Sequence, residues 1–92
     1  MNTKCVKIIV KGKVQGVFFR KFTKIAADGL EINGFVKNQY DGSVYIEACG
    51  ETTQLEKFIQ WCKQGSEQAQ VAESEVKEIE QKIFSSFRIV PF

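Results

Sequence analysis

With 92 residues, of which 43% are hydrophobic and 26% charged, the chain can bury one apolar core and is too mixed in composition to be disordered or fibrous. It has no apolar stretch of membrane-spanning length, and lysines interrupt its first apolar residues, which predicts a single cytoplasmic domain over residues 1–92 that does not bind a membrane. The net charge is only +2, but seven basic residues and no acidic one precede Asp28. Most of these lysines can be explained as a solvated face; alternatively, the basic first third surrounds an anion site and concentrates negatively charged ligands there.

The first element expected along the chain is a half-buried strand. Residues 4–11 alternate between apolar and other side chains, which is the period of a strand. Its inward face carries Val6, Ile8 and Val10. A loop containing two glycines follows, and residues 20–30 then place apolar side chains near helical spacing. A helix is therefore expected there, ending near Gly29.

A β-hairpin is expected next. Residues 33–38 and 43–49 are two short alternating runs, and a polar turn containing Asp41-Gly42 separates them. A dipeptide of this type between two alternating runs is a strong hairpin signal. The two runs should therefore pair as adjacent antiparallel strands.

The rest of the chain predicts a second helix and a closing strand. Thr53 and Glu56 form a capping box at the start of a run with helical spacing, and Gly65 ends it. Residues 67–82 are ambiguous, because their composition favours a helix while short apolar pairs within them could lie on a strand edge. Composition alone favours the helix. Residues 84–90 are β-branched and aromatic enough for a short strand.

This order of elements predicts the fold class. Strand, helix, hairpin, helix and strand is the order of a ferredoxin-like βαββαβ sandwich, an α+β fold in which two helices pack on one face of an antiparallel sheet. The fold serves many unrelated activities, so it does not predict one by itself.

Histidine and cysteine usage limits the chemistry. The chain contains no histidine, which removes the usual general base and the usual metal ligand. Cys62 lies on the apolar stripe of the second helix and should be a core residue, whereas Cys5 and Cys49 fall on the strand face opposite Val6 and Ala48 and should be exposed. Three cysteines cannot all pair, and their spacing fits neither a disulfide framework nor a zinc site. Free thiols are therefore predicted.

The loop between the first strand and the first helix is the strongest candidate site. Its sequence is GKVQGVFFR, from Gly12 to Arg20. A loop that enters a helix can aim its backbone N–H groups at one point, and its glycines allow the tight curl of an anion-binding nest. Arg20 can place its planar guanidinium over the same point. Phenylalanine rings packed under the loop would hold it rigid and keep it partly dry.

Two segments resemble the signatures of the acylphosphatase family. GKVQGVFFR matches every fixed position of G-x-V-Q-G-V-x-[FY]-R, and NGFVKNQYDGSVYIEACGE, residues 33–51, resembles the second signature G-[WF]-V-[RK]-N-x-x-D-G-S-V with its following strand. A looser similarity continues to the final F-x-x-F-x-I, so the resemblance spans nearly the whole chain. It implies that part of residues 71–83 forms an edge strand, against their helical composition.

The resemblance also implies an activity and a set of roles. Acylphosphatases hydrolyse a carboxyl-phosphate anhydride to a carboxylate and inorganic phosphate, without a metal ion or other cofactor. Arg20 is implied to bind the phosphoryl group, and Asn38 to position the attacking water. The implied backbone ligands of the phosphoryl group are the N–H groups of Gln15, Gly16, Val17, Phe18 and Phe19. The expected partner is a small acyl phosphate, with no nucleic acid and no membrane, and the protein is expected to be a monomer.

Each of these side chains also has a purely structural interpretation. Asn38 could form a turn by bonding its own backbone, and Gln15 could hold the loop by hydrogen bonds. Phe18, Phe19 and Phe22 are expected to pack rather than to stack on a substrate.

Two other classes of function remain open from the sequence. An RNA-recognition module shares the topology, but it needs exposed aromatic residues on its central strands, and only Tyr45 and Phe35 qualify. The other is a domain that binds an anion without catalysis. The physiological acyl phosphate is also open: carbamoyl phosphate, acetyl phosphate and the acyl phosphate of glycolysis all fit.

Overall fold

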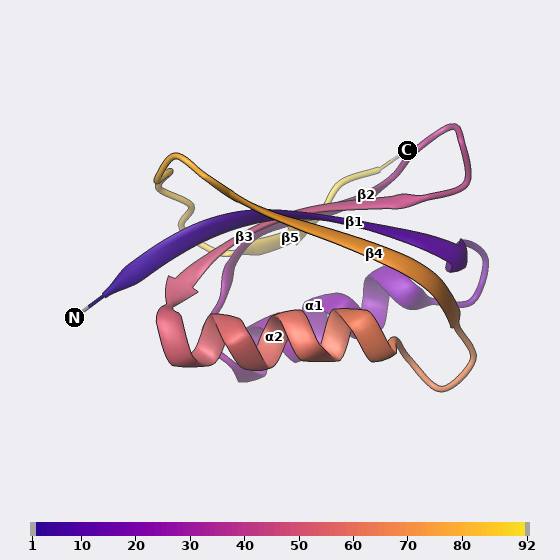
Figure 1. Ribbon diagram of the computed structural model, residues 1–92, viewed down its shortest axis with the longest axis horizontal. Coiled ribbons are helices and arrows are strands. Elements are labelled where there is room, and N and C mark those ends of the chain that lie inside the picture. The colour runs from indigo at the N-terminus through magenta and orange to yellow at the C-terminus, as the bar shows by residue number, and fades with distance from the viewer. Residues whose placement is uncertain (1, 92) are drawn as a thin grey trace.

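Two helices cover one face of a five-stranded sheet in a computed structural model that describes residues 2–91 (Figure 1). The elements in chain order are β1 (Thr3–Lys13), α1 (Phe19–Gly29), β2 (Asn33–Asn38), β3 (Val44–Glu51), α2 (Thr52–Gln64), β4 (Gln70–Ile79) and β5 (Phe87–Ile89). The predicted α+β fold is confirmed, and so are both helices, the hairpin and the closing strand. No helix within residues 2–91 has the length and hydrophobicity needed to cross a membrane.

The sheet has the order β4-β1-β3-β2-β5 and is mixed. Its neighbouring strands are antiparallel except for β2 and β5, which run parallel. The expectation of a wholly antiparallel sheet is therefore wrong at this edge. The physical reason is that β4 and β5 lie at opposite edges, so residues 80–86, here called the crossing segment, must pass over the sheet before β5 begins.

The core lies between the sheet and the helices, as the alternation in β1 predicts. Ile8 and Val10 on β1, Ile46 on β3 and Phe58 on α2 are completely buried there. The crossing segment lies over the opposite face of the sheet. Burial of the apolar side chains between the sheet and the helices accounts for most of the stability expected of so small a domain.

The start of α2 differs from its prediction. Glu51 is the N-cap residue, and its side chain accepts a hydrogen bond from the Gln54 backbone N–H at 3.3 Å. Thr53 already lies inside the helix, so the predicted capping box with Glu56 is wrong. The helix ends at Gln64 with Gly65 as its C-cap, as predicted. Burial raises the pKa of the Cys62 thiol, in keeping with its predicted place in the core.

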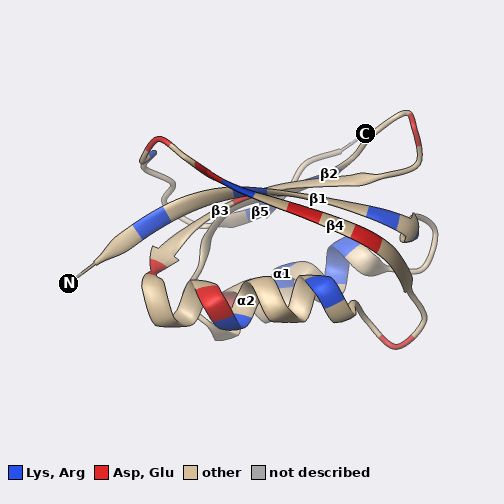
Figure 2. Cartoon of the chain, in the orientation of Figure 1, with Lys and Arg blue, Asp and Glu red and all other residues tan. Residues whose placement is uncertain are grey.

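β4 confirms the strand that the family resemblance implies and shows that the helical composition was misleading. It pairs with β1 from Cys5 to Lys13, and it forms one edge of the sheet. Tertiary pairing outweighs local propensity here. Figure 2 shows acidic residues along β4 and basic residues at both ends of β1 and at the start of α1. A charged edge strand resists pairing with other chains.

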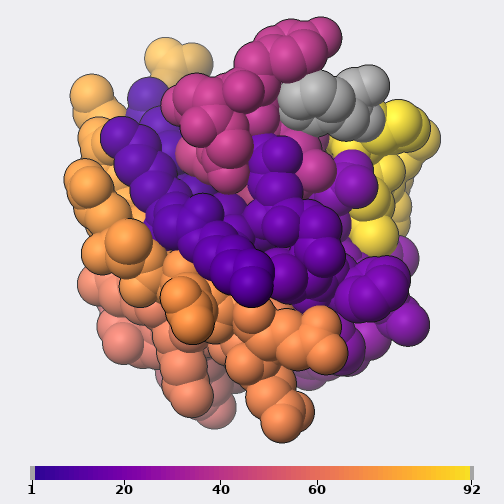
Figure 3. Space-filling model, turned by 90° about the vertical axis from the view of Figure 1, so that its right-hand side faces the viewer, coloured from indigo at the N-terminus to yellow at the C-terminus, as the bar shows by residue number. Residues whose placement is uncertain are grey.

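Gly12 ends the regular pairing of β1 with β4. The register shifts between Lys11 and Gly12, and a Cβ atom at Gly12 would lie 2.2 Å from the Gln70 carbonyl oxygen. Only glycine allows this close approach, since its φ is +131° as well. β1 is therefore irregular at this point and ends one residue later, at Lys13. Figure 3 shows that end of the molecule, where the purple loop lies beside the yellow C-terminal segment and the magenta β2–β3 turn.

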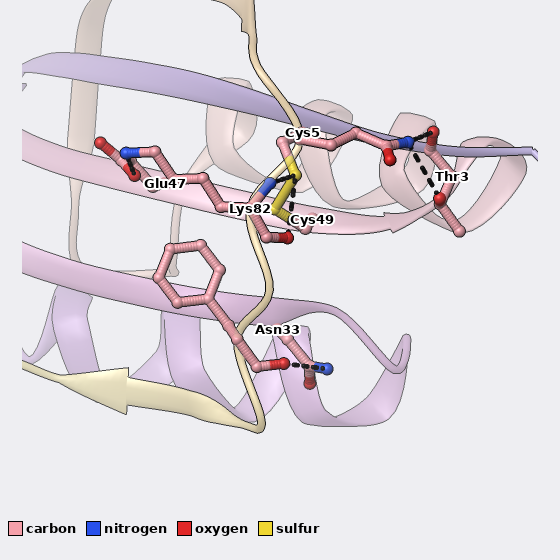
Figure 4. Close-up of a disulfide and its surroundings, with 8 residues drawn as sticks. Thr3, Cys5, Asn33, Glu47, Cys49 and Lys82 are labelled. Atoms are coloured by element: carbon pink, nitrogen blue, oxygen red, sulfur yellow. Dashed lines mark hydrogen bonds and ion pairs between the residues drawn. A yellow bond between two sulfur atoms is a disulfide. The ribbon is translucent and has the colours of Figure 1, made fainter.

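The crossing segment is anchored on three successive strands. Lys82 makes two of the contacts: its backbone N–H donates to Cys5 Sγ on β1 at 3.3 Å, and its Nζ donates to Glu47 Oε1 on β3 at 2.8 Å (Figure 4). The third contact is made by Asn33 on β2, whose Nδ2 donates to the Phe84 carbonyl at 3.0 Å. Burial alone would raise the pKa of Glu47, but hydrogen bonds from Lys82 and Tyr45 outweigh burial and lower it. No pattern in the sequence predicts this buried carboxylate.

Cys5 and Cys49 form a disulfide, so the prediction of free thiols is wrong for these two residues. The hairpin register places them directly opposite one another on β1 and β3. They share the face opposite Val6 and Ala48, as predicted, but Cys5 is buried rather than exposed because the crossing segment covers it. Spacing along the chain could not reveal the pair, since only the register brings the two sulfur atoms together.

Reduction of this disulfide is expected to lower the free energy of unfolding by about 4 kcal/mol, because the two cysteines have a sequence separation of 44 and the loop that they close restricts the unfolded state. Urea unfolding with and without reductant measures the change. The double variant Cys5→Ala/Cys49→Ala is the control and should not respond to reductant. A thiol count on the denatured, unreduced protein should find Cys62 alone; three thiols would contradict the disulfide.

Candidate active site

The β1–α1 loop curls at two left-handed residues. Gly16 has φ +75° and Phe18 has φ +59°. The side chains of Val17, which lies between them, and of Val14, two residues before Gly16, are buried in the core. An alternation of ordinary and left-handed residues gathers successive N–H groups into a concave nest that attracts anions. The predicted curl of the loop is therefore present, with one of its two left-handed positions occupied by a bulky aromatic residue.

The N–H groups of this loop and of the first turn of α1 find no acceptor in the part of the chain that the structure describes. Phe18 is the N-cap of α1 but makes no side-chain cap, and no acidic residue lies in the first turn. Within residues 2–91, no acceptor is hydrogen-bonded to a backbone N–H from Gln15 to Lys21; the first intrahelical bond runs from the Phe22 N–H to the Phe18 carbonyl at 3.1 Å. Unpaired N–H groups and the helix dipole together make this point electropositive.

Arg20 lies in the first turn of α1, beside this nest. It is half-buried, and its Nη1 donates to the Val90 carbonyl at a long 3.4 Å. A guanidinium group has five N–H donors in a planar fork. The contact with Val90, near the C-terminus, thus orients the Arg20 side chain. Most of the guanidinium N–H donors stay available for an anion.

Gln15 holds the loop against the β2–β3 turn. Its Nε2 donates to the carbonyls of Gln39 and Ser43, both at 2.8 Å. Asp41 shapes that turn, because its Oδ1 accepts from the Ser43 hydroxyl at 2.6 Å and from the Ser43 N–H at 2.9 Å, and these bonds lower the pKa of Asp41. The structural interpretation of the Gln15 side chain is confirmed, and Asp41-Gly42 serves the hairpin alone.

Asn38 stands at the end of β2, paired with Val44 on β3. Its Oδ1 is buried and has no hydrogen-bond partner within residues 2–91. A buried polar atom without a partner costs about 1–3 kcal/mol, so such atoms are rare and call for an explanation. The turn-forming interpretation of Asn38 does not supply one, because its Oδ1 bonds no backbone group.

These features meet in one cavity of about 300 Å³. The lining residues are Val14, Gln15, Gly16, Phe18, Phe19, Arg20, Lys21, Asn38 and Ile89. Every predicted site residue therefore contributes to the lining except Val17, which the structure places in the loop with its side chain in the core. The lining contains no histidine, cysteine, aspartate or glutamate that could hold a metal ion.

Sequence reasoning missed three lining residues, Val14, Lys21 and Ile89, and misplaced two rings. Lys21 follows the signature arginine, and Ile89 enters from β5, whose parallel pairing with β2 no local pattern could reveal. Phe19 does pack under the loop, where it is buried and stacks on Trp61 with ring centroids 5.6 Å apart. Phe18 and Phe22 were expected to pack likewise, but 68% and 40% of their surfaces are exposed.

The sheet and its two helices define an α+β protein of ferredoxin-like fold, and its β1–α1 loop, the first turn of α1 and the end of β2 line one electropositive cavity. The family model described as Acylphosphatase matches residues 6–89, and the chain belongs to the acylphosphatase family. An acylphosphatase of Acaryochloris marina is 42% identical over 89 residues, which is 97% of this chain and 96% of the relative.

Solved structures agree with this family. The structure of an acylphosphatase from Coxiella burnetii is similar at a TM-score of 0.93 and 38% identity, and covers 97% of this chain and 94% of its own. The crystal structure of acylphosphatase from Bacillus subtilis gives a TM-score of 0.91 at 38% identity, with 97% and 99% covered. The chain is thus an acylphosphatase, an enzyme of the class that acts on small acyl phosphates.

Proposed function

We propose that the protein binds the phosphoryl group of its substrate in the nest of the β1–α1 loop and hydrolyses the carboxyl-phosphate bond there, without a metal ion or other cofactor. The observation that carries the proposal is the convergence on one cavity of unpaired backbone N–H groups, the Arg20 guanidinium and the orphaned Asn38 oxygen. The first two recognise an anion, and the third can accept a hydrogen bond from water.

Phosphoryl binding is the task of Arg20 and the loop. The backbone N–H groups of Gln15, Gly16, Val17, Phe18 and Phe19 donate to the phosphoryl oxygens from one side, and the Arg20 fork donates to two of them from another. These donors are fixed before the substrate arrives, because Gln15 and the Phe19–Trp61 stack hold the loop. Preorganised donors stabilise the charge of the transition state without reorganising.

The leaving group explains how the reaction proceeds without histidine. An acyl phosphate releases a carboxylate, whose conjugate acid has a pKa of about 4, so the departing oxygen requires no proton at neutral pH. General acid catalysis is then unnecessary. The enzyme has only to neutralise phosphoryl charge and to align a water in line with the breaking bond.

Asn38 is proposed to align that water. Its Oδ1 accepts one hydrogen bond from the water and so directs an oxygen lone pair toward phosphorus. An amide is not a base, so the proton passes to a phosphoryl oxygen or to solvent. This role satisfies the buried oxygen that the protein leaves without a partner.

The remaining expectations concern the setting of the enzyme. We propose a single domain over residues 1–92 that acts as a cytoplasmic monomer on a small-molecule acyl phosphate. The Cys5–Cys49 disulfide favours an oxidising compartment instead, since disulfides are rare in the cytosol. A thiol count on protein blocked with alkylating reagent in intact cells decides between these two settings.

Recognition of RNA is the weaker alternative. Phe35 and Tyr45 do lie on the sheet face away from the helices, but their rings pack together with centroids 6.0 Å apart, and Phe84 of the crossing segment packs edge-on against Phe35 at 6.0 Å. The two aromatic residues that would stack on bases therefore already have protein partners. RNA binding needs such rings to be exposed.

A steady-state assay on benzoyl phosphate with a chelator present tests the proposed function. We expect saturable release of phosphate that the chelator does not change, with inorganic phosphate as a competitive inhibitor. Loss of activity in chelator that a divalent cation restores would contradict the metal-free mechanism. Phosphate binding without any turnover would instead identify a non-catalytic anion-binding domain.

A further inference from the structure

Phe18 adopts a backbone conformation that is unfavourable for an aromatic residue. An aromatic residue in the left-handed region strains the backbone by roughly 1 kcal/mol or more, and glycine or asparagine would occupy the same position more easily. Its ring then remains 68% exposed, so the strain gains little burial in return. Strained residues of this kind concentrate at functional sites.

The ring of Phe18 lies at the rim of the active-site cavity together with Ile89. Both residues line the cavity, and Ile89 is also 39% exposed although it is a large aliphatic residue on β5. They come from separate elements, the β1–α1 loop and the last strand, and both contribute to this cavity. The cavity thus has a polar part, formed by the loop N–H groups, Arg20 and Asn38, and an apolar rim.

A substrate bound by its phosphoryl group must extend its acyl group out of the nest. The nest and Arg20 surround the phosphoryl oxygens, and the bridging oxygen carries the acyl group away from them toward the cavity mouth. Two exposed apolar side chains at that mouth offer contact to an apolar acyl group and no hydrogen bond to a polar one. Burying such surfaces against each other is favourable in proportion to the area removed from water.

We propose that Phe18 and Ile89 form an acyl subsite that makes the enzyme selective for acyl phosphates with aromatic or extended aliphatic acyl groups over those with small or polar ones. This inference rests on the proposed function, because it assumes that the phosphoryl group sits in the nest. The subsite binds the acyl group in the same way before and during the reaction, so it acts on KM rather than on kcat.

The test compares acetyl phosphate with benzoyl phosphate in the wild-type enzyme and in two single variants. The readout is the ratio of kcat/KM for benzoyl phosphate to kcat/KM for acetyl phosphate. Phe18→Ala should lower this ratio by roughly three- to tenfold, the range expected for loss of one aromatic contact, with the loss appearing in KM. Ile89→Ala should lower the ratio by about two- to threefold, with the larger loss falling on benzoyl phosphate.

Two controls separate a subsite from a disturbed loop. Ile25→Ala removes another exposed apolar side chain, on α1, that does not line the cavity, and it should leave the ratio unchanged. The inhibition constant of inorganic phosphate reports the nest alone. If the ratio is unchanged in both subsite variants, so that any loss of kcat/KM is the same for the two substrates, the acyl subsite is overturned. A wild-type enzyme that hydrolyses neither compound would overturn the proposed function itself.

Discussion

Arg20→Ala is expected to lower kcat/KM for benzoyl phosphate by about a thousandfold or more while leaving the protein folded. The guanidinium supplies the only side-chain charge in the predicted phosphoryl-binding set, and a charge-stabilising arginine in phosphoryl transfer is worth roughly that factor. The fold should survive because Arg20 is half-buried and makes one long hydrogen bond, to Val90. We expect the free energy of unfolding to change by less than about 1 kcal/mol.

Two neighbouring substitutions make the Arg20 result specific. Arg20→Lys keeps the charge but loses the planar fork, so its activity should fall between those of the alanine variant and the wild type. Lys21→Ala removes the adjacent exposed cation that lines the same cavity, and it should cost less than about tenfold. Near-normal turnover of Arg20→Ala, or equal losses in Arg20→Ala and Lys21→Ala, would reject a specific role for the guanidinium.

The sequence predicts those parts of the fold in which one short pattern fixes one element. Alternation identified β1 and its inward face, and Asp41-Gly42 identified the hairpin, because each depends on neighbours within a few residues. β4 was the opposite case. Its own composition favours a helix, and its strand geometry comes from pairing with β1, far away along the chain. Only the resemblance to a family supplied that non-local information.

The same distinction applies to the site. The loop from Gly12 to Arg20 carries its chemistry in one continuous segment, so its role as a nest could be predicted from glycines that precede a helix. Ile89 and the Cys5–Cys49 disulfide could not, because each depends on which strands become neighbours. The exposure of Phe18 was missed for another reason: Phe18 occupies a variable position of the signature, and no local pattern shows that a left-handed backbone turns its side chain outward.

Asn38→Ala is expected to lower kcat by about a hundredfold and to change the inhibition constant of inorganic phosphate by less than about threefold. Phosphate binding depends on the loop N–H groups and Arg20, whereas the orphaned Asn38 oxygen is proposed to hold the attacking water. The substitution should not destabilise the protein through that oxygen, because removing a buried polar atom without a partner relieves a cost. Urea unfolding and steady-state kinetics on the same preparation measure both effects.

Asn33→Ala is the matched control, since Asn33 begins the same strand that Asn38 ends. Its Nδ2 donates to the Phe84 carbonyl at 3.0 Å and so helps to anchor the crossing segment, far along β2 from the cavity. We expect this variant to lose about 1 kcal/mol of stability and to keep its turnover. The two asparagines should therefore show opposite losses. Equal losses of turnover and phosphate affinity in Asn38→Ala would make Asn38 a binding residue, and a loss of stability like that of Asn33→Ala would make it a structural one.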